Sequence, residues 1–225
     1  MDSADFTSWS MILGAAAGRP VERDLFSRRY GAVIRAYLAA RWRVAQDSPG
    51  VADATNDVFV DCFKDGGALS RVDPTFAGGF RAFLYGVVRN VALMAERRLA
   101  RQRDAAGGFA VENLVDSEAS LSRVFDRAWA EAVVQEARDK MGARASRSAV
   151  AARRFRALAM RFEQGMPPRE IAVALEEPVE RIYEALREAR VEFKASLMEV
   201  MAGYHPAASE ADLERHCVEL LAALR

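Results

Sequence analysis

The sequence has few of the residues on which most enzyme active sites depend. Its 225 residues include two histidines and two cysteines, and it contains no P-loop, no GxGxxG, no HExxH and no GxSxG motif. Two histidines leave little capacity for general-base catalysis, and nothing resembles a phosphate-binding glycine loop. We therefore expect no catalytic residues, no cofactor and no enzymatic activity.

Cysteine is too sparse to form a disulfide framework or a metal cluster. Cys62 and Cys217 lie far apart, without a CxxC motif, on apolar helical patterns that favour buried free thiols over a disulfide. A zinc site through His205, His216 and Cys217 would lack a fourth ligand at a familiar spacing, so we expect no bound metal.

Net charge and long hydrophobic runs are also lacking. Lysine and arginine number 32 and aspartate and glutamate 32, so attraction to a charged partner must come from local segregation of charge. The apolar patch from Trp9 to Leu13 is too short to cross a bilayer, and Asp2 and Asp5 precede it instead of the basic residues of a signal peptide. These features predict a cytoplasmic protein without membrane insertion.

Hydrophobic periodicity predicts an all-α chain. Apolar residues recur every 3.6 residues over 24–42, over 51–64 and from Phe80 onward, and no useful alternation typical of a strand occurs. Residues 65–79 contain four glycines and a proline and predict a loop. Residues 104–117 predict the start of a linker, and a weaker amphipathic stretch follows them. We expect two small helical domains, an N-terminal bundle and a C-terminal helix-turn-helix, joined by a long linker.

Charge is segregated in the N-terminal half. Six arginines and a single glutamate, Glu96, lie between Arg81 and Arg103. The helix predicted over 51–64 carries Asp53, Asp57 and Asp61 outside or beside its apolar stripe. Taken alone, such carboxylates favour a solvated helix face over a binding surface.

Residues 155–194 have the layout of a helix-turn-helix. A first helix ends near Phe162, a short helix begins at Pro167–Pro168 and contains Ile171, and Pro178 marks the start of the last helix. This geometry presents the last helix to a DNA major groove, although the same pattern fits any small three-helix packing.

The most specific signal is a resemblance in four segments. The stretch RFEQGMPPREIAVALEEPVERIYEALREAR (161–190) resembles the C-terminal domain of bacterial RNA polymerase sigma factors of the extracytoplasmic-function (ECF) type. The stretches LFSRRYGAVIRAYLAAR (25–41), DATNDVFVDCF (53–63) and FRAFLYGVVRNVALMAERRLAR (80–101) resemble helices of that family's N-terminal domain. The resemblance covers about residues 7–103 and 150–200.

The resemblance implies a sigma factor that binds core RNA polymerase and directs promoter recognition, DNA melting and transcription initiation. It implies an N-terminal sigma domain over 1–103, a partly helical interdomain linker over 104–149, a C-terminal helix-turn-helix domain over 150–202 and an extension helix over 203–225. Its implied partners are core RNA polymerase and promoter DNA. An anti-sigma factor, or the C-terminal segment acting as an autoinhibitor, is a further expected partner.

The resemblance implies three sets of functional residues in this sequence. Docking on the core polymerase would use Asp53, Asn56, Asp57 and Asp61. Binding of the promoter −10 element would use Arg81, Tyr85, Arg89, Asn90, Arg97, Arg98 and Arg101. Reading of the −35 element would use Glu180, Arg181, Tyr183, Glu184 and Arg187. Thr55, in the docking helix, is a candidate phosphorylation site.

The predicted recognition helix departs from the family's basic character. Between Glu176 and Lys194 there are six acids and four bases, and Glu176 occupies a position where a turn glycine is common. Two alternatives therefore stay open: a helix-turn-helix regulator without polymerase docking, and a sigma-like decoy or interaction protein. The extension helix would cap the C-terminal lobe, clamp the two lobes together or dimerise.

Overall fold

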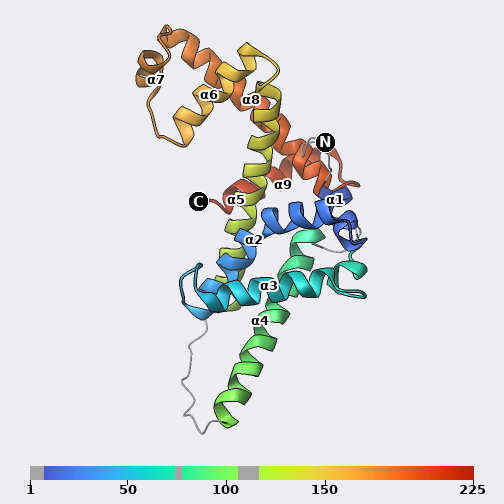
Figure 1. The fold of residues 1–225 in the computed structure, drawn as a ribbon. Helices are drawn as coiled ribbons and strands as arrows, with labels where there is room; N and C mark the ends of the chain where they lie inside the picture. The colour runs from blue at the N-terminus through green and yellow to red at the C-terminus, as the bar shows by residue number, and fades with distance from the viewer. Residues whose placement is uncertain (1–7, 74–77, 106–116) are drawn as a thin grey trace.

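The computed structural model describes residues 8–73, 78–105 and 117–225, and these residues form helices, turns and loops without a strand (Figure 1). The helices are α1 (Ser8–Ala16), α2 (Pro20–Trp42), α3 (Pro49–Phe63), the 3-10 helix η2 (Ala68–Arg71), α4 (Gly79–Ala105), α5 (Glu118–Ala145), α6 (Ala149–Phe162), α7 (Pro168–Ala174), α8 (Val179–Tyr204) and α9 (Glu210–Ala222). The expected all-α class is therefore confirmed. The predicted loop over 65–79 contains η2, and its residues 74–77 lie outside the described residues.

Local sequence signals set many helix starts. Proline occupies the first turn of α2, α3 and α7, where its missing N–H costs no intrahelical hydrogen bond. Serine caps three others: the hydroxyls of Ser117, Ser148 and Ser209 accept hydrogen bonds from backbone N–H groups three residues later. The helix that Ser209 caps, α9, lies within the predicted extension over 203–225.

The larger hydrophobic cluster, here called the body, contains α1–α5, α9 and the C-terminal part of α8. Its centre is aromatic: Tyr30 lies 4.7 Å from Phe26 and 5.5 Å from Trp129 between ring centroids. Phe80 also contacts Tyr30, at 5.3 Å. Segments far apart in sequence therefore share one core.

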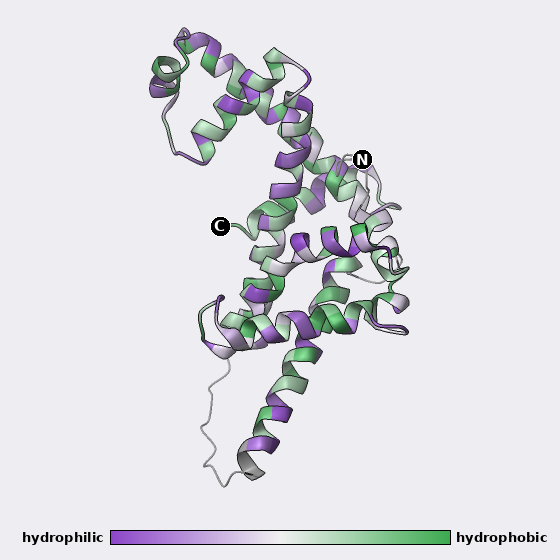
Figure 2. Ribbon diagram, in the orientation of Figure 1, coloured by the Kyte–Doolittle hydropathy of each residue, from purple (hydrophilic) through white to green (hydrophobic). Residues whose placement is uncertain are grey.

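The smaller cluster, here called the lobe, contains α6, α7 and the N-terminal part of α8. Its buried residues are Ala157, Ile171, Ala172, Ile182, Ala185 and Leu186. In Figure 2, hydrophobic and hydrophilic residues alternate along these helices, as expected where one face of a helix is buried. Because α8 contributes to both clusters, it joins the lobe to the body as one continuous helix (Figure 1).

Helix α5 lies where the sequence predicts an interdomain linker. Its residues Leu121, Phe125, Trp129 and Val133 are buried in the body, where α5 packs on α2 and α8. The preceding part of the predicted linker, 106–116, lies outside the described residues. The division into two domains and a linker stays a prediction.

Helix α9 packs against α8 and α5 in the body, not against the lobe. Cys217 of α9 and Cys62 of α3 are buried free thiols, as predicted. Among the helices that the structure describes, none combines the length and hydrophobicity that crossing a membrane requires.

Candidate functional site

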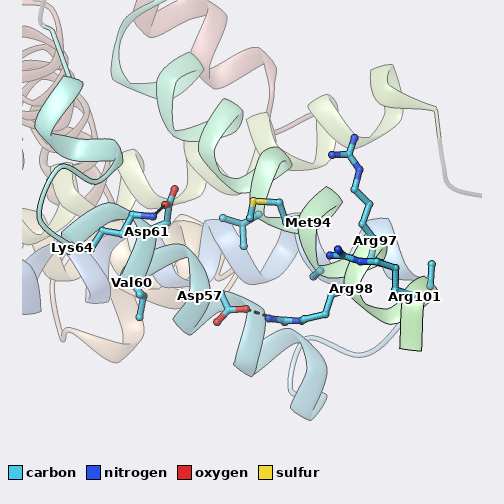
Figure 3. Close-up of a pocket in the computed structure, with 11 residues that line it drawn as sticks. Asp57, Val60, Asp61, Lys64, Met94, Arg97, Arg98 and Arg101 are labelled. Carbon is cyan, nitrogen blue, oxygen red and sulfur yellow. Dashed lines mark hydrogen bonds and ion pairs between the residues drawn. The ribbon is translucent and has the colours of Figure 1, made fainter. Parts of the chain in front are cut away.

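Helix α3 and the second half of α4 enclose a groove of about 830 Å³ (Figure 3). On α3 the groove residues Val60 and Asp61 lie three and four residues after Asp57, so one helix face supplies all three, and Lys64 follows as the C-cap of the helix. Apolar side chains of α4, such as Met94, line it together with Arg97, Arg98 and Arg101. Val60 and Met94 remain 63% and 66% exposed. The groove therefore combines exposed apolar surface with charges of both signs.

The four predicted docking residues all lie on α3. Asp53 and Asn56 are exposed. Asp57 pairs with Arg98 of α4 at 3.2 Å, and Asp61 pairs with Lys64 at 2.6 Å (Figure 3). Because these ion pairs are solvent-exposed, they cost little to break and leave the carboxylates available to a partner.

The predicted −10 residues fall into two groups, of which the first faces α5. Arg81 pairs with Asp126, the Tyr85 hydroxyl donates to Glu118 at 3.0 Å, and Arg89 pairs with Glu118 at 3.2 Å. Partial burial, and next the hydrogen bond with Glu118, raise the pKa of Tyr85 to about 12. These three side chains fasten α4 to α5 in this structure.

The second group forms a basic arm. Asn90, Arg97, Arg98 and Arg101 are exposed on α4, whose C-terminal half extends away from the body (Figure 1). Figure 3 shows Arg98 directed toward Asp57, while Arg97 points elsewhere. We call Arg97, Arg98 and Arg101 the arginine arm.

Sequence reasoning missed how the only glutamate among these arginines is used. Both carboxylate oxygens of Glu96 accept from the Arg41 guanidinium of α2, at 2.6 and 3.0 Å, and Trp42 Nε1 donates to Glu96 at 2.9 Å. The hydrogen bonds with Glu96, opposed by burial, raise the pKa of Arg41. Glu96 therefore anchors α4 to α2, and its charge is compensated within the body.

At the other end of the molecule, the predicted −35 residues share an exposed surface. Glu180, Arg181, Tyr183, Glu184 and Arg187 are all exposed on α8, while Ile182 and Leu186 between them are buried in the lobe. Burial of one face of α8 thus turns the predicted reading face outward.

The turn between α7 and α8 is strained. Glu176 adopts φ of 52°, in the left-handed region that favours glycine. This agrees with the sequence observation that a glycine is common at this position of the family's turn.

Three of the six acids between Glu176 and Lys194, the segment that includes the predicted recognition helix, form ion pairs. Glu177 pairs with Arg153 at 3.3 Å and Glu192 with Arg154 at 2.5 Å, so bases of α6 compensate both. Glu188 pairs with Arg187 at 2.7 Å. The excess of acids counted in the sequence therefore serves in part to hold α6 on the segment that includes α8.

The hypothesis that Thr55 is phosphorylated is wrong for the folded protein. Thr55 is 3% exposed, and its hydroxyl donates to the Val51 carbonyl oxygen at 2.7 Å. The helix presents Thr55 to the core because Thr55 lies four residues after Val51 and three before Val58, both of which are fully buried on the same helix face.

No protein-family model matches the chain, and no curated protein matches it significantly. Within the described ranges, no group of three or more histidine, cysteine, aspartate or glutamate side chains could hold a metal ion.

Proposed function

We propose that the protein is a sigma-type transcription initiation factor that binds core RNA polymerase and recognises promoter DNA. One observation carries the proposal: an acidic helix face and an arginine arm line the same groove, and a helix-turn-helix lobe is held at the far end of the molecule. Each surface corresponds to one of the three functions that the sequence resemblance implies.

The docking part of the proposal is supported by the exposed face of α3. Asp53 and Asn56 are exposed, and the Asp57 carboxylate forms a surface ion pair with Arg98. Such a face complements a basic partner surface, because complementary potentials speed encounter and fix orientation. Core polymerase binding would replace the Asp57–Arg98 pair with contacts to the partner.

The DNA part is supported by the arginine arm. Arg97, Arg98 and Arg101 are exposed, and the nearby Glu96 is paired with Arg41 instead of opposing them. Arginines in this arrangement suit phosphate contacts, from which nucleic-acid binding gains much of its affinity. When α3 engages the polymerase, Arg98 would be released from Asp57 for the promoter.

Affinity for purified bacterial core RNA polymerase tests the docking function. We expect submicromolar binding by the intact chain and a loss of at least about tenfold in Asp53→Lys/Asp57→Lys. Asp53→Lys alone leaves the Asp57–Arg98 ion pair in place, so a loss of affinity in this variant cannot come from breaking that pair. Glu131→Lys, on an exposed position of α5, changes the charge by the same amount as Asp53→Lys and is its control. The proposal fails if the intact chain does not bind, or if both charge reversals leave affinity unchanged.

Promoter binding by the complex tests the arginine arm separately. We expect Arg97→Ala/Arg101→Ala to weaken promoter binding several-fold, and to reduce its salt dependence, without changing affinity for the core enzyme. Arg35→Ala, an exposed arginine of α2, is the matched control. Equal loss in both variants would mean that the arm has no special role.

A second candidate function is a sigma-like decoy that binds polymerase without directing it to promoters. The exposed Glu180 and Glu184 on the predicted reading face favour it, because carboxylates repel DNA phosphates. A complex with core polymerase that starts no transcription on any template would support the decoy. DNA binding without polymerase affinity would instead indicate a helix-turn-helix regulator.

A further inference from the structure

The two histidines of the chain meet at the joint between α8 and α9. His205 is the C-cap of α8, and His216 lies in the middle of α9. Their ring centroids are 4.4 Å apart, with an interplanar angle of 37°. Two helices that are consecutive in the chain thus bring their imidazoles into direct contact.

The histidines border a cavity of about 590 Å³ at the start of α4. The titratable and charged side chains that line it with them are Arg81 of α4, Asp126 of α5, Tyr204 of α8 and Glu219 of α9. Arg81 and Asp126 pair with each other, and the Tyr204 hydroxyl lies 3.0 Å from that of Tyr30. Glu219 is exposed. Arg81 and Asp126 offset each other's charge, and water screens the exposed Glu219, so these groups do little to offset a positive charge on the histidines.

Helix α9 is held by a small contact area. Its buried residues are Cys217 and Leu220, and Leu213, Ala223 and Leu224 contribute partly buried contacts to the body. The pair between Lys194 of α8 and Glu214 of α9, at 2.7 Å, is exposed and adds little. A modest repulsion at the histidine contact can therefore decide whether α9 stays in place.

We propose that His205 and His216 form an acid-sensitive clasp that holds α9 on the body when the rings are neutral and releases it when both are protonated. Two imidazolium ions at this separation repel each other, and partial burial removes much of the water that would screen them. The Nδ1 atom of His216 is buried and has no hydrogen-bond partner within the described part of the chain. If Nδ1 of His216 carried a proton, the described part of the chain would offer that N–H group no acceptor.

The direction of the response follows from His205. Its partial burial, and next the neighbouring His216, lower the pKa of His205 below its usual value. Protonation thus favours the state in which α9 has left the joint. The clasp is closed above the pKa of an exposed histidine, about 6.5, and opens as the pH falls through and below that value.

Opening uncovers Cys217 and Leu220 together with the body surface beneath them. His205 belongs to α8 and stays beside Gly79 at the start of α4, where a Cβ atom on Gly79 would lie only 3.2 Å from its Cε1. The clasp rests on this contact geometry and does not depend on the proposed function.

Hydrogen exchange of the full-length chain tests the clasp. We expect the protection of the amides of Glu210–Ala222, corrected for the intrinsic pH dependence of exchange, to fall several-fold between pH 7.5 and pH 5.5. The limit for one histidine is about tenfold, because an exposed histidine of pKa about 6.5 is then almost fully protonated. Protection of α2 should stay unchanged. Unaltered protection of α9, or a parallel loss in α2, would overturn the proposal.

Three variants and one direct titration complete the test. His205→Asn should remove most of the pH response of α9. His216→Gln should reduce it, because the burial of His205 remains, whereas His216→Arg should expose α9 already at pH 7.5. The proposal is wrong if both neutral variants retain the full response or if the arginine variant keeps α9 protected. Independently of any variant, NMR titration of the ring protons in the intact chain should give a midpoint for His205 below 6.5. A midpoint at or above that value contradicts the clasp.

Discussion

The body and the lobe bury their helices by different means. Large aromatic side chains such as Phe26, Tyr30, Phe80 and Phe125 are fully buried in the body. The lobe buries no aromatic side chain in its cluster, and half of its six core residues are alanines. Around that small core, ion pairs join Arg138 to Glu163 and Arg154 to Glu192.

Because its core is smaller and lacks aromatic rings, we expect the lobe to be less stable than the body. Hydrophobic stabilisation scales with the apolar area removed from water, so alanine and isoleucine contribute less than interlocked aromatic rings. Regions with few buried contacts open at a lower free energy than the rest of the molecule. The lobe therefore depends on α8, which continues into the aromatic core, for part of its order.

The largest predicted effect comes from the body. Phe125→Ala removes a fully buried ring that contacts Tyr85 at 5.2 Å, and we expect it to lower the free energy of unfolding by about 4 kcal/mol. Urea denaturation followed by far-UV circular dichroism measures this loss. The matched control, Phe162→Ala, changes a phenylalanine that is 63% exposed beside the lobe and should cost about 0.5 kcal/mol or less. Similar losses in both variants would show that the buried ring of the body contributes no more to stability than the exposed ring of α6.

The buried ion pair of the body gives the next largest effect. Arg29 lies 3.2 Å from Glu136, and their side chains are 16% and 8% exposed. Glu136→Leu leaves the guanidinium buried without its partner, so we expect a loss of about 3 kcal/mol. Arg29→Met/Glu136→Leu should recover most of that loss, as measured by a double-mutant cycle. Additive losses would show that the two charges do not depend on each other.

A core substitution in the lobe should have a smaller and local effect. Ile182 is fully buried between α6, α7 and α8, and we expect Ile182→Ala to destabilise the lobe by about 2 kcal/mol. Hydrogen exchange should show lost protection in α6 and α7 and unchanged protection in α2. Equal loss in α2 would mean that body and lobe unfold as one unit.

The smallest effect concerns the ion pairs at the rim of the lobe. Arg154 pairs with Glu192 at 2.5 Å, and both side chains are about one-third exposed, so Arg154→Ala should cost about 1 kcal/mol. Arg28→Ala, which breaks an exposed pair with Asp24 in the body, should cost about 0.3 kcal/mol. Thermal denaturation at low and at 1 M salt measures both. A difference that persists at high salt would rule out an electrostatic cause.

Helices with strong apolar stripes could be predicted from the sequence, because the 3.6-residue period depends only on local order. The predicted stretches 24–42 and 51–64 correspond to α2 and α3 within a few residues. The packing of α5 could not be predicted. Its stripe is diluted by Ala128 and Ala132, and no local signal tells that Trp129 stacks on Tyr30 of α2.

For the candidate site, the placement of these side chains on helix faces was predictable and their pairing was not. Spacings along α3 and α4 place the acids and the arginine arm on helix faces, and the structure brings those faces to one groove. By contrast, Arg81 and Tyr85 face partners on α5 that are 45 and 33 residues away in the chain. Such long-range contacts leave no periodic signal in a single sequence.

The unbroken helix α8 restricts how the distance between the lobe and the body can change during evolution. Its 26 residues span about 39 Å, because an α-helix rises about 1.5 Å per residue. One residue inserted near its middle would also turn the lobe by about 100° and point its exposed face in a new direction. An insertion of seven residues comes within about 20° of two whole turns and nearly preserves that direction, so the span of this molecule changes most readily in steps of about 10 Å.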